Sequence, residues 1–273
     1  MAITWKEAER RLDIAAELLD KTDRCIVEGP LHAGIDLGTA DVVLMVLNAN
    51  GEPVAAFLEW AEVVRDGIVV DFIGAVDIVC RLLEKAANRL NREISQAATS
   101  FPPGTDHRLS TNILERAGLD VVAVRDEPCC VAQLLQLDKA AVVDIGGGTT
   151  GTAVVQNGNI VFSDDEPSGG RHIGLSIAGH FDISFEEAEK RKRQPERYGI
   201  LDLARPTLQR ISDIVARHIK GHAVEKIILT GGTCCLPGIE DVFMHELGLP
   251  VQLPNQPLLL TPLAIASLSL NKI

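Results

Sequence analysis

The sequence has few aromatic residues, an excess of acids over bases and no long hydrophobic run. Aromatic side chains make up only 4% of its 273 residues, so the core is expected to consist mainly of Ala, Val, Leu and Ile. Acidic residues outnumber basic ones by 38 to 26, and the net charge of −12 excludes a general nucleic-acid-binding surface, which needs a basic footprint. The hydrophobic fraction of 46% is that of a globular protein and excludes a disordered chain.

No segment has the length of a membrane span. The strongest candidate, LLLTPLAIASLSL at 258–270, is too short and is interrupted by Pro262. The first residues, MAITWKEAERRLD, carry charges where a secretory peptide needs an apolar stretch. We therefore expect a cytoplasmic protein without a membrane span.

The cysteines show no metal-binding spacing. They occupy positions 25, 80, 129, 130, 234 and 235, and no Cys-x-x-Cys occurs. Cys is small and apolar, so we interpret all six as reduced thiols, mostly packed in the core. The alternative is a zinc site assembled from the two Cys-Cys pairs, although sequence neighbours rarely converge on one tetrahedral ion.

The order of expected elements repeats along the chain. Strands at 31–37, 42–47 and 54–58 are followed by alternating helices and strands, and strands at 140–145, 149–155 and 160–162 begin the same order again. Such a duplication predicts two α/β lobes with a ligand cleft between them. The expected helices lie at 77–92, 106–117, 126–135, 170–179, 184–192, 206–219, 239–246 and 261–270, and further strands at 68–70, 94–99, 121–124, 227–230 and 251–253.

Residues 3–20 show helical periodicity ahead of this body. Trp5, Ala8 and Leu12 fall near one stripe, and Gly29-Pro30 separates the segment from the first strand. We expect this helix to pack on the body; a docking element for a partner is the alternative.

Two Asp- and Gly-containing turns carry the clearest chemistry. Asp-Leu-Gly-Thr at 36–39 and Asp-Ile-Gly-Gly-Gly-Thr at 144–149 each place an Asp at the end of a strand and a Thr at the start of the return strand. Glycine lets a ligand approach the backbone, and successive N–H groups in such a turn bind anions. The carboxylates would repel phosphate unless Mg²⁺ lay between them. Together the turns predict a Mg²⁺–nucleotide site; ordinary β-turns with local Asp bonds are the alternative.

A third glycine turn follows the expected strand at 227–230. In Leu-Thr-Gly-Gly-Thr at 229–233, a flat base or a sugar would fit against the backbone. The alternative is a strand-to-helix loop that uses glycine for steric reasons.

Five segments resemble one superfamily in its expected motif order. They match the two phosphate motifs, the adenosine motif and the two connecting helices of the actin, sugar kinase and heat-shock chaperone ATPases, and they span residues 34–270. The segments are GIDLGTADVVLMV (34–46), DEPCCVAQLL (126–135), VVDIGGGTTGTAVV (142–155), ILTGGTCCLPGIEDVF (228–243) and TPLAIASLSL (261–270). Within the superfamily the chain is most similar to the ethanolamine-utilization protein J group, which is encoded with bacterial microcompartments and described as chaperone-like.

The resemblance implies a fold and its division. We expect a duplicated ribonuclease-H-like, actin-like ATPase fold with two lobes around a nucleotide cleft and reduced outer subdomains. Residues 1–29 would form the N-terminal helix, 30–137 plus 255–273 the first lobe, and 138–254 the second.

The resemblance also implies a cofactor and site residues. The cofactor would be ATP or another purine nucleotide with Mg²⁺. Asp36 and Asp144 would hold Mg²⁺ through water, and Glu127 would orient the attacking water, so these three would be the catalytic residues. The other nucleotide-binding residues would be Gly38, Thr39, Gly146, Gly147, Gly148 and Thr149 at the phosphates, Gly231 and Gly232 at the adenosine, and Glu189 and Lys192 at the ribose and base.

The residues by themselves leave two of these roles open. Asp126-Glu127-Pro128 is also an ordinary helix start, with an N-cap Asp, an early acid and an early Pro. The KRKR run at 190–193 is typical of a solvated helix face.

Three functions remain open. The chain lacks a convincing counterpart of the lysine that supports hydrolysis in the chaperone ATPases, and Lys85 is a poor candidate, so hydrolysis is expected to be slow. The first function is a chaperone-like ATPase whose partner is a protein client or a microcompartment enzyme or shell component, with the protein in the cytoplasm or at the microcompartment. The second is a non-hydrolysing nucleotide-binding adaptor or scaffold. The third is a small-molecule kinase, disfavoured because the short outer subdomains leave little room for a second substrate.

Overall fold

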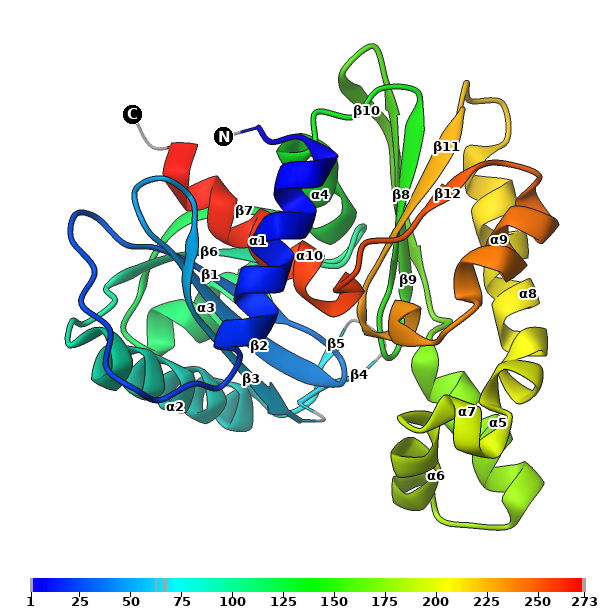
Figure 1. Ribbon diagram of the computed structural model, residues 1–273, viewed down its shortest axis with the longest axis horizontal. Coiled ribbons are helices and arrows are strands. Elements are labelled where there is room, and N and C mark those ends of the chain that lie inside the picture. Colours follow the sequence, from blue (N-terminus) through cyan, green and yellow to red (C-terminus); the bar gives the residue numbers. More distant parts are fainter. Residues whose placement is uncertain (1, 62, 66–67, 272–273) are drawn as a thin grey trace.

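Two five-stranded sheets lie side by side in the computed structural model, which describes residues 2–61, 63–65 and 68–271 (Figure 1). Each sheet has an antiparallel three-strand meander followed by two strands parallel to its central strand. The first sheet has the order β3 (Pro53–Trp60), β2 (Asp41–Leu47), β1 (His32–Leu37), β6 (Gln96–Phe101), β7 (Asp120–Asp126). The second has the order β10 (Asn159–Glu166), β9 (Thr150–Gln156), β8 (Ala140–Ile145), β11 (Lys226–Thr230), β12 (Val251–Gln252).

The two sheets therefore have the same strand order, which confirms the predicted duplication and the α/β class. A small hairpin of β4 (Val64–Arg65) and β5 (Ile68–Val69) extends from the first sheet. The helices are α1 (Trp5–Leu18), α2 (Phe72–Leu90), α3 (Arg108–Arg116), α4 (Glu127–Leu134), α5 (Gly170–Phe181), α6 (Phe185–Lys192), α7 (Pro195–Tyr198), α8 (Ile200–Ile219), α9 (Ile239–Leu247) and α10 (Pro257–Leu268), with 3-10 turns η1 (Gly232–Cys235) and η2 (Ser269–Asn271).

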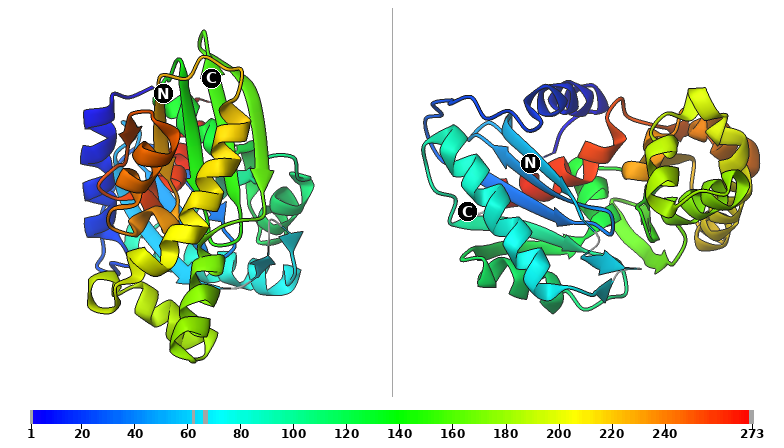
Figure 2. Two further views of the ribbon diagram at one scale, coloured as in Figure 1. Left: turned by 90° about the vertical axis from the view of Figure 1, so that its right-hand side faces the viewer. Right: turned by 90° about the horizontal axis from the view of Figure 1, so that it is seen from below.

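Helices cover both faces of each sheet. On the first sheet, α2 and α3 pack on one face while α1, α4 and α10 lie on the other (Figure 2). On the second sheet, α8 and α9 cover the outer side. Helices α4 and α10 pack against each other and contact strands of both sheets, so one hydrophobic core continues from one sheet through these helices to the other. This shared layer joins the halves of the molecule.

The close packing of α10 on β1 depends on a glycine. A Cβ built on Gly34 would lie 2.3 Å from the backbone nitrogen of Ala266 and 2.5 Å from its Cα. Any side chain at position 34 would push α10 away from the sheet. A single small residue thus determines how closely α10 approaches the central strand.

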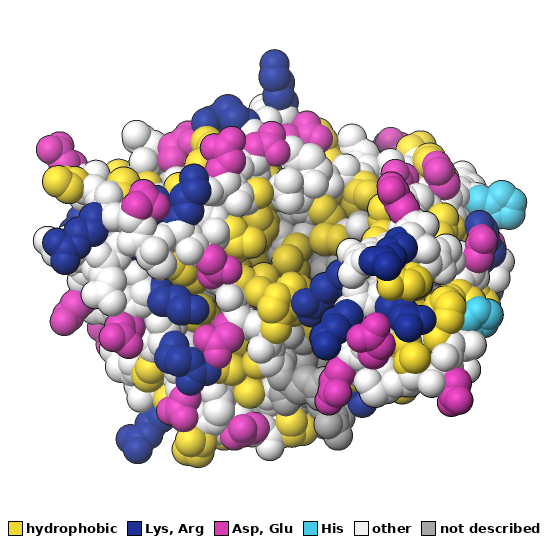
Figure 3. All heavy atoms as spheres, turned by 60° about the horizontal axis from the view of Figure 1, so that its bottom comes forward, with side chains coloured by type: hydrophobic (Ala, Val, Ile, Leu, Met, Phe, Trp, Pro, Cys, Tyr) yellow, Lys and Arg dark blue, Asp and Glu magenta, His cyan; other side chains and the backbone are white. Residues whose placement is uncertain are grey.

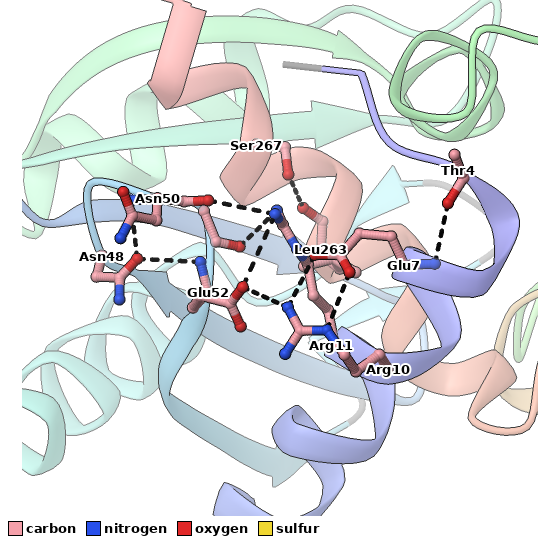
Figure 4. Close-up of polar contacts among 10 residues, drawn as sticks. Thr4, Glu7, Arg10, Arg11, Asn48, Asn50, Glu52, Leu263 and Ser267 are labelled. Atoms are coloured by element: carbon pink, nitrogen blue, oxygen red, sulfur yellow. Dashed lines mark hydrogen bonds and ion pairs between the residues drawn. The ribbon is translucent and has the colours of Figure 1, made fainter.

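Helix α1 is tied to the first sheet and packs along β3 and α10. Thr4 caps it by accepting a hydrogen bond from the Glu7 N–H. The buried Arg11 donates to the Gly51 carbonyl at 2.7 Å, to the Asn50 carbonyl at 3.2 Å and to Glu7, so it locks the helix onto the β2–β3 turn (Figure 4). The expectation that this segment packs on the body is confirmed.

Three helices begin earlier than the sequence pattern predicted. The expected helix at 77–92 begins at Phe72, because Asp71 caps it by accepting from the Gly74 N–H at 2.8 Å. Pro206 and Pro262 were placed at or near helix starts, but both lie inside helices, α8 and α10. A proline in the second turn removes one backbone hydrogen bond, a loss that the buried faces of these helices offset.

All six cysteines are free thiols. In the part of the chain that the structure describes, no three His, Cys, Asp or Glu side chains are placed to hold a metal ion, so the zinc alternative finds no support. None of the described helices is long and apolar enough to span a bilayer.

Candidate nucleotide site between the two sheets

The two Asp- and Gly-containing turns have the same length. Leu37 pairs with Val42 across the first turn, and Ile145 pairs with Thr150 across the second, so four residues lie between the paired strands in each case. This register corrects the prediction that both threonines open a return strand. Thr39 lies within its turn, and Asp41 occupies the position equivalent to Thr149.

A cavity of about 770 Å³ lies between the sheets, and residues of both turns line it. The structure brings nearly all predicted site residues into its lining, and Gly148, though in the second turn, does not line it. The predicted residues that line the cavity are Asp36, Gly38, Thr39, Glu127, Asp144, Gly146, Gly147, Thr149, Glu189, Lys192, Gly231 and Gly232. Their placement is thus known, whereas their roles stay predictions.

Buried carboxyl groups gather at one end of the cavity. Burial is the main cause that raises the pKa of Asp36 to about 8, and the neighbouring charges of Asp144 and Asp41 add to the rise. Burial also raises the pKa of Asp41 to about 6 and that of Asp144 to about 6. These groups are close enough to repel one another, so the cavity favours protonation or a cation between them.

The two strand-end aspartates are held by neighbouring hydroxyl groups. Thr261 of α10 donates to Asp144 Oδ2 at 2.6 Å, and Ser100 of β6 donates to Asp36 Oδ1 at 3.2 Å. A Cβ on Gly231, whose φ is +94°, would lie 2.4 Å from Asp144 Oδ1. The third turn therefore needs glycine because it passes directly over this carboxylate.

Glu127 begins α4 at the side of the same cavity. Asp126 caps the helix by accepting from the Cys129 N–H at 3.0 Å, so the segment is a helix start and also supplies an acid to the cavity. Burial raises the pKa of Glu127 well above its usual range, and the charges of Asp36 and Asp144 raise it further. The surroundings of Glu127 thus disfavour its charged form.

The second turn has two kinds of backbone group. Its carbonyl oxygens are used within the protein: Gly146 O accepts from Gly170 N–H at 3.0 Å and from the Thr233 hydroxyl at 2.8 Å, and Gly147 O accepts from Arg171 N–H at 2.7 Å. Among the described residues, no hydrogen-bond acceptor takes up the N–H groups of Gly147 and Gly148. The turn consequently presents donors rather than acceptors, as an anion site requires.

The cavity also has apolar lining. The side chains of Ile173, Phe185 and Leu258 line it, as do Gly231 and Gly232 of the third turn. Lys192 donates to Glu189 Oε1 at 2.7 Å and to the Gly170 carbonyl at 3.0 Å, so this pair is fixed at the wall. Apolar side chains together with two glycines and a polar pair suit a base and a sugar.

Residues 190–193 are partly solvated, as expected, and also border the cavity. Lys190 and Arg193 are exposed and Lys192 is half-buried, and all three line the cavity, as does Arg171. Figure 3 shows a hollow with hydrophobic side chains at its base and a group of Lys and Arg side chains on one rim. Sequence periodicity did not predict that this helix borders the cavity, because a short polar helix has no apolar stripe to indicate which side faces the cleft.

The donor set fits magnesium. Mg²⁺ binds through one or two carboxylates and keeps water and phosphate oxygens as its other ligands. Asp36 and Asp144 supply carboxylates at one end of the cavity, and the mutual repulsion of these groups would be relieved by a divalent cation. Within the described residues there is no ready-made cluster of three metal ligands.

The sequence reading missed two residues that line the cavity and one buried acid outside its lining. Asp41 and Thr261 line the cavity, and Asp165 on β10, which does not line it, has a buried Oδ1 without a partner among the described residues. Burial raises the pKa of Asp165 to about 7. An acid directly after a glycine turn was a usable signal for Asp41, whereas no local pattern marks Asp165.

Comparisons with known proteins identify close relatives. A family model described as type IV pilus assembly protein PilM matches residues 130–260. Ethanolamine utilization protein EutJ of Escherichia coli strain K12 is 52% identical over 258 residues, which are 94% of this chain and 92% of that protein. The crystal structure of EutJ from Carboxydothermus hydrogenoformans is 42% identical, with a TM-score of 0.89, and the match covers 96% of this chain and 98% of that one.

A more distant structure supports the fold. MreB5 of Spiroplasma citri bound to ADP is 17% identical, with a TM-score of 0.68, and the match covers 86% of this chain and 94% of that one. At this identity the likeness concerns the fold alone. Together with the two mixed sheets and their flanking helices, it confirms the predicted actin-like ATPase fold.

Proposed function

The chain belongs to the family of the ethanolamine utilization protein EutJ, and from this membership and the cavity we propose that it binds a Mg²⁺–purine nucleotide between its two sheets. The observation that carries the proposal is the convergence of two equivalent strand-end aspartates, Asp36 and Asp144, in one cavity. The duplication places them at matching turns, and repulsion between their charges is relieved when a divalent cation lies between them.

Each part of the cavity has a role in this proposal. Asp36 and Asp144 hold Mg²⁺ through water, and the N–H groups of Gly147 and Gly148 with the Thr39 hydroxyl bind phosphate oxygens. The adenosine lies along the third turn, and the ribose and base reach the polar pair at 189 and 192. The bound metal would supply the positive charge that balances phosphates and carboxylates.

We further propose a chaperone-like ATPase with slow hydrolysis that acts in ethanolamine utilization. Glu127 would orient the attacking water. Burial, together with the charges of Asp36 and Asp144, raises its pKa and so disfavours the charged carboxylate that would accept a proton from water. The same observation favours the second candidate, a nucleotide-binding adaptor or scaffold that does not turn over.

The partner in this proposal is a protein client or a microcompartment enzyme or shell component, so the chain would lie in the cytoplasm or at the microcompartment. We propose that the chain consists of three rigid units, which are residues 1–29, residues 30–137 plus 255–273, and residues 138–254. The inner face of α1 is buried against β3 and α10, so a docking role would fall to its outer face.

Calorimetry with purine nucleotides tests the binding proposal. The wild type should bind at least one of ATP, ADP, GTP and GDP in the presence of Mg²⁺. Asp36→Asn and Asp144→Asn should weaken Mg²⁺-dependent binding by about 10- to 100-fold. Asp164→Asn is the matched control, because Asp164 is an exposed carboxylate outside the cavity, and it should bind like the wild type. Absence of binding by the wild type would refute the proposal.

A hydrolysis assay separates the two candidates. If the protein is an ATPase, Glu127→Gln should abolish phosphate release while nucleotide still binds. Phosphate release at the rate of a no-protein control, with binding intact, identifies the adaptor.

A further inference from the structure

Trp60 and Arg193 meet across the mouth of the cavity. Trp60 ends the edge strand β3 of the first sheet, and Arg193 follows α6 in the second half of the molecule. The guanidinium carbon of Arg193 lies 4.1 Å from the centroid of the Trp60 ring. Both residues line the cavity, and Trp60 is half exposed. This distance is within the range of a cation–π contact.

Hydrogen bonds hold the chain next to Trp60 and next to Arg193, each within its own half of the molecule. The Ala61 N–H donates to the Ala40 carbonyl at 3.1 Å, so the end of β3 is tied to the first Gly turn. Lys192, directly before Arg193, is held by Glu189 and by the Gly170 carbonyl. A contact between Trp60 and Arg193 therefore connects the phosphate turn of one half to the sugar-side wall of the other.

A half-buried acid of the first half also interacts with Arg193. Asp41 is the register partner of Trp60 on β2 and lines the same cavity. The positive charge of Arg193 partly offsets the rise in the pKa of Asp41 that burial and Asp144 cause. Arg193 thus faces an aromatic ring and a carboxylate, both belonging to the first half.

The contact lies away from the layer that joins the two halves. Helices α4 and α10 pack on each other and on strands of both sheets, whereas α6 lies away from them at the lower end of the molecule (Figure 1). A contact that joins the two halves away from the shared layer restrains movement of one half against the other. The stack of Trp60 and Arg193 is such a contact.

We propose that Trp60 and Arg193 form a clasp across the cleft, which controls how fast a nucleotide enters and leaves. The inference rests on the proposed nucleotide binding and adds to it two residues that would touch neither the metal nor the reacting phosphates. Breaking the stack lets α6 swing away from β3, and a bound nucleotide then leaves sooner.

The size of the effect follows from the strength of such contacts. A partly exposed cation–π pair contributes about 0.5–1 kcal/mol, which corresponds to about a two- to fivefold change in rate. Trp60→Ala and Arg193→Ala should each accelerate release of a fluorescent purine nucleotide by this factor. The double variant should show no larger acceleration than either single one, because both changes remove the same contact.

A charge-matched control lies two residues away. Arg191 stacks on Phe181 and Tyr198 within its own half, with its guanidinium carbon 4.9 and 5.0 Å from their ring centroids. Arg191→Ala removes the same charge from the end of α6, two residues from Arg193, without breaking a contact across the cleft. Its release rate should match that of the wild type. Equal release rates for Arg193→Ala and Arg191→Ala would overturn the proposal.

A second readout needs no nucleotide. The chain has two tryptophans, so Trp5→Phe leaves Trp60 as the single fluorophore. In that background Arg193→Ala should increase quenching of Trp60 by acrylamide, and Arg191→Ala should not. Failure of the wild type to bind any nucleotide refutes the proposed function, while unchanged quenching on Arg193→Ala refutes the clasp itself. The two failures are therefore distinguishable.

Discussion

Single residues at the end of the cavity determine how the fold responds to pH. Asp36, Asp144, Asp41 and Asp165 all have a raised pKa with burial as the largest cause. In the unfolded chain aspartates titrate near 4, so between about pH 4 and 8 the folded state binds more protons than the unfolded state. The free energy of unfolding should therefore fall as pH rises through this window.

Urea unfolding in the presence of a chelator, at pH 5 and at pH 8, checks this expectation. The wild type should be less stable at pH 8. Asp36→Asn, which cannot ionise, should reduce the difference between the two pH values by on the order of a few kcal/mol, because Asp36 has a pKa of about 8. Asp164→Asn should leave the difference unchanged. A wild type that is equally stable at both pH values would contradict the expectation.

At the same scale, the sequence predicted the aspartates, Glu127 and the three glycine turns, because each follows an apolar strand or starts a helix. It placed Thr39 wrongly at the start of a return strand. The pairing register shows that the two turns have equal length although their compositions differ, and the amino-acid sequence alone does not reveal that register. It also missed Asp165, which lies far from the turns in sequence and meets them through the pairing of β10 with β9.

At the scale of elements, the approach of α10 to β1 yields a mutational test. Gly34→Ala introduces a Cβ within 2.3 Å of the Ala266 nitrogen, so α10 must shift. We expect a loss of about 1–3 kcal/mol in the free energy of unfolding. Gly179→Ala is the control, since a Cβ at that helical glycine meets nothing within 4 Å, and it should be neutral or slightly stabilising. Equal denaturation midpoints for the two variants would show that the contact can relax.

The attachment of α1 offers a second element-scale test. Arg11 is buried and donates to two backbone carbonyls, whereas the neighbouring Arg10 is about half exposed and forms surface ion pairs with Glu7 and Glu52. Arg11→Ala should cost about 2–3 kcal/mol, because buried acceptors lose a charged donor. Arg10→Ala should cost about 0–1 kcal/mol. Thermal unfolding of both variants measures the difference, and a larger loss for Arg10→Ala would contradict the placement of α1.

The element boundaries show where sequence patterns fall short. The meanders and most helices were predicted within a few residues, because their periodicity is strong. Helices α8 and α10 extend upstream through Pro206 and Pro262, since packing of the buried face of α8, and of the almost fully buried α10, outweighs one lost hydrogen bond in each helix. The side of α6 that faces the cleft depends on tertiary contacts that no local pattern contains.

At the scale of the whole molecule, a ligand in the cavity touches both sheets and should stabilise them together. At a nucleotide concentration 100 times its Kd, with Mg²⁺ present, the gain should be about 2.7 kcal/mol. Hydrogen exchange should slow at residues 38–41 and at 231–235, which lie in different halves of the protein. Helix α3, remote from the cavity, serves as the internal reference. Slowing confined to one half would contradict a site shared by both.

The position of α10 in the chain has a consequence for biosynthesis. This helix covers the central strands of the first sheet, yet it is translated after the entire second sheet. While the ribosome makes residues 138–256, the apolar side of β1 and β2 has α1 as an early cover but lacks its main one. The first half of the nascent chain therefore cannot complete its hydrophobic packing until α10 is synthesised. A chain released before residue 257 would expose an apolar surface to chaperones and proteases.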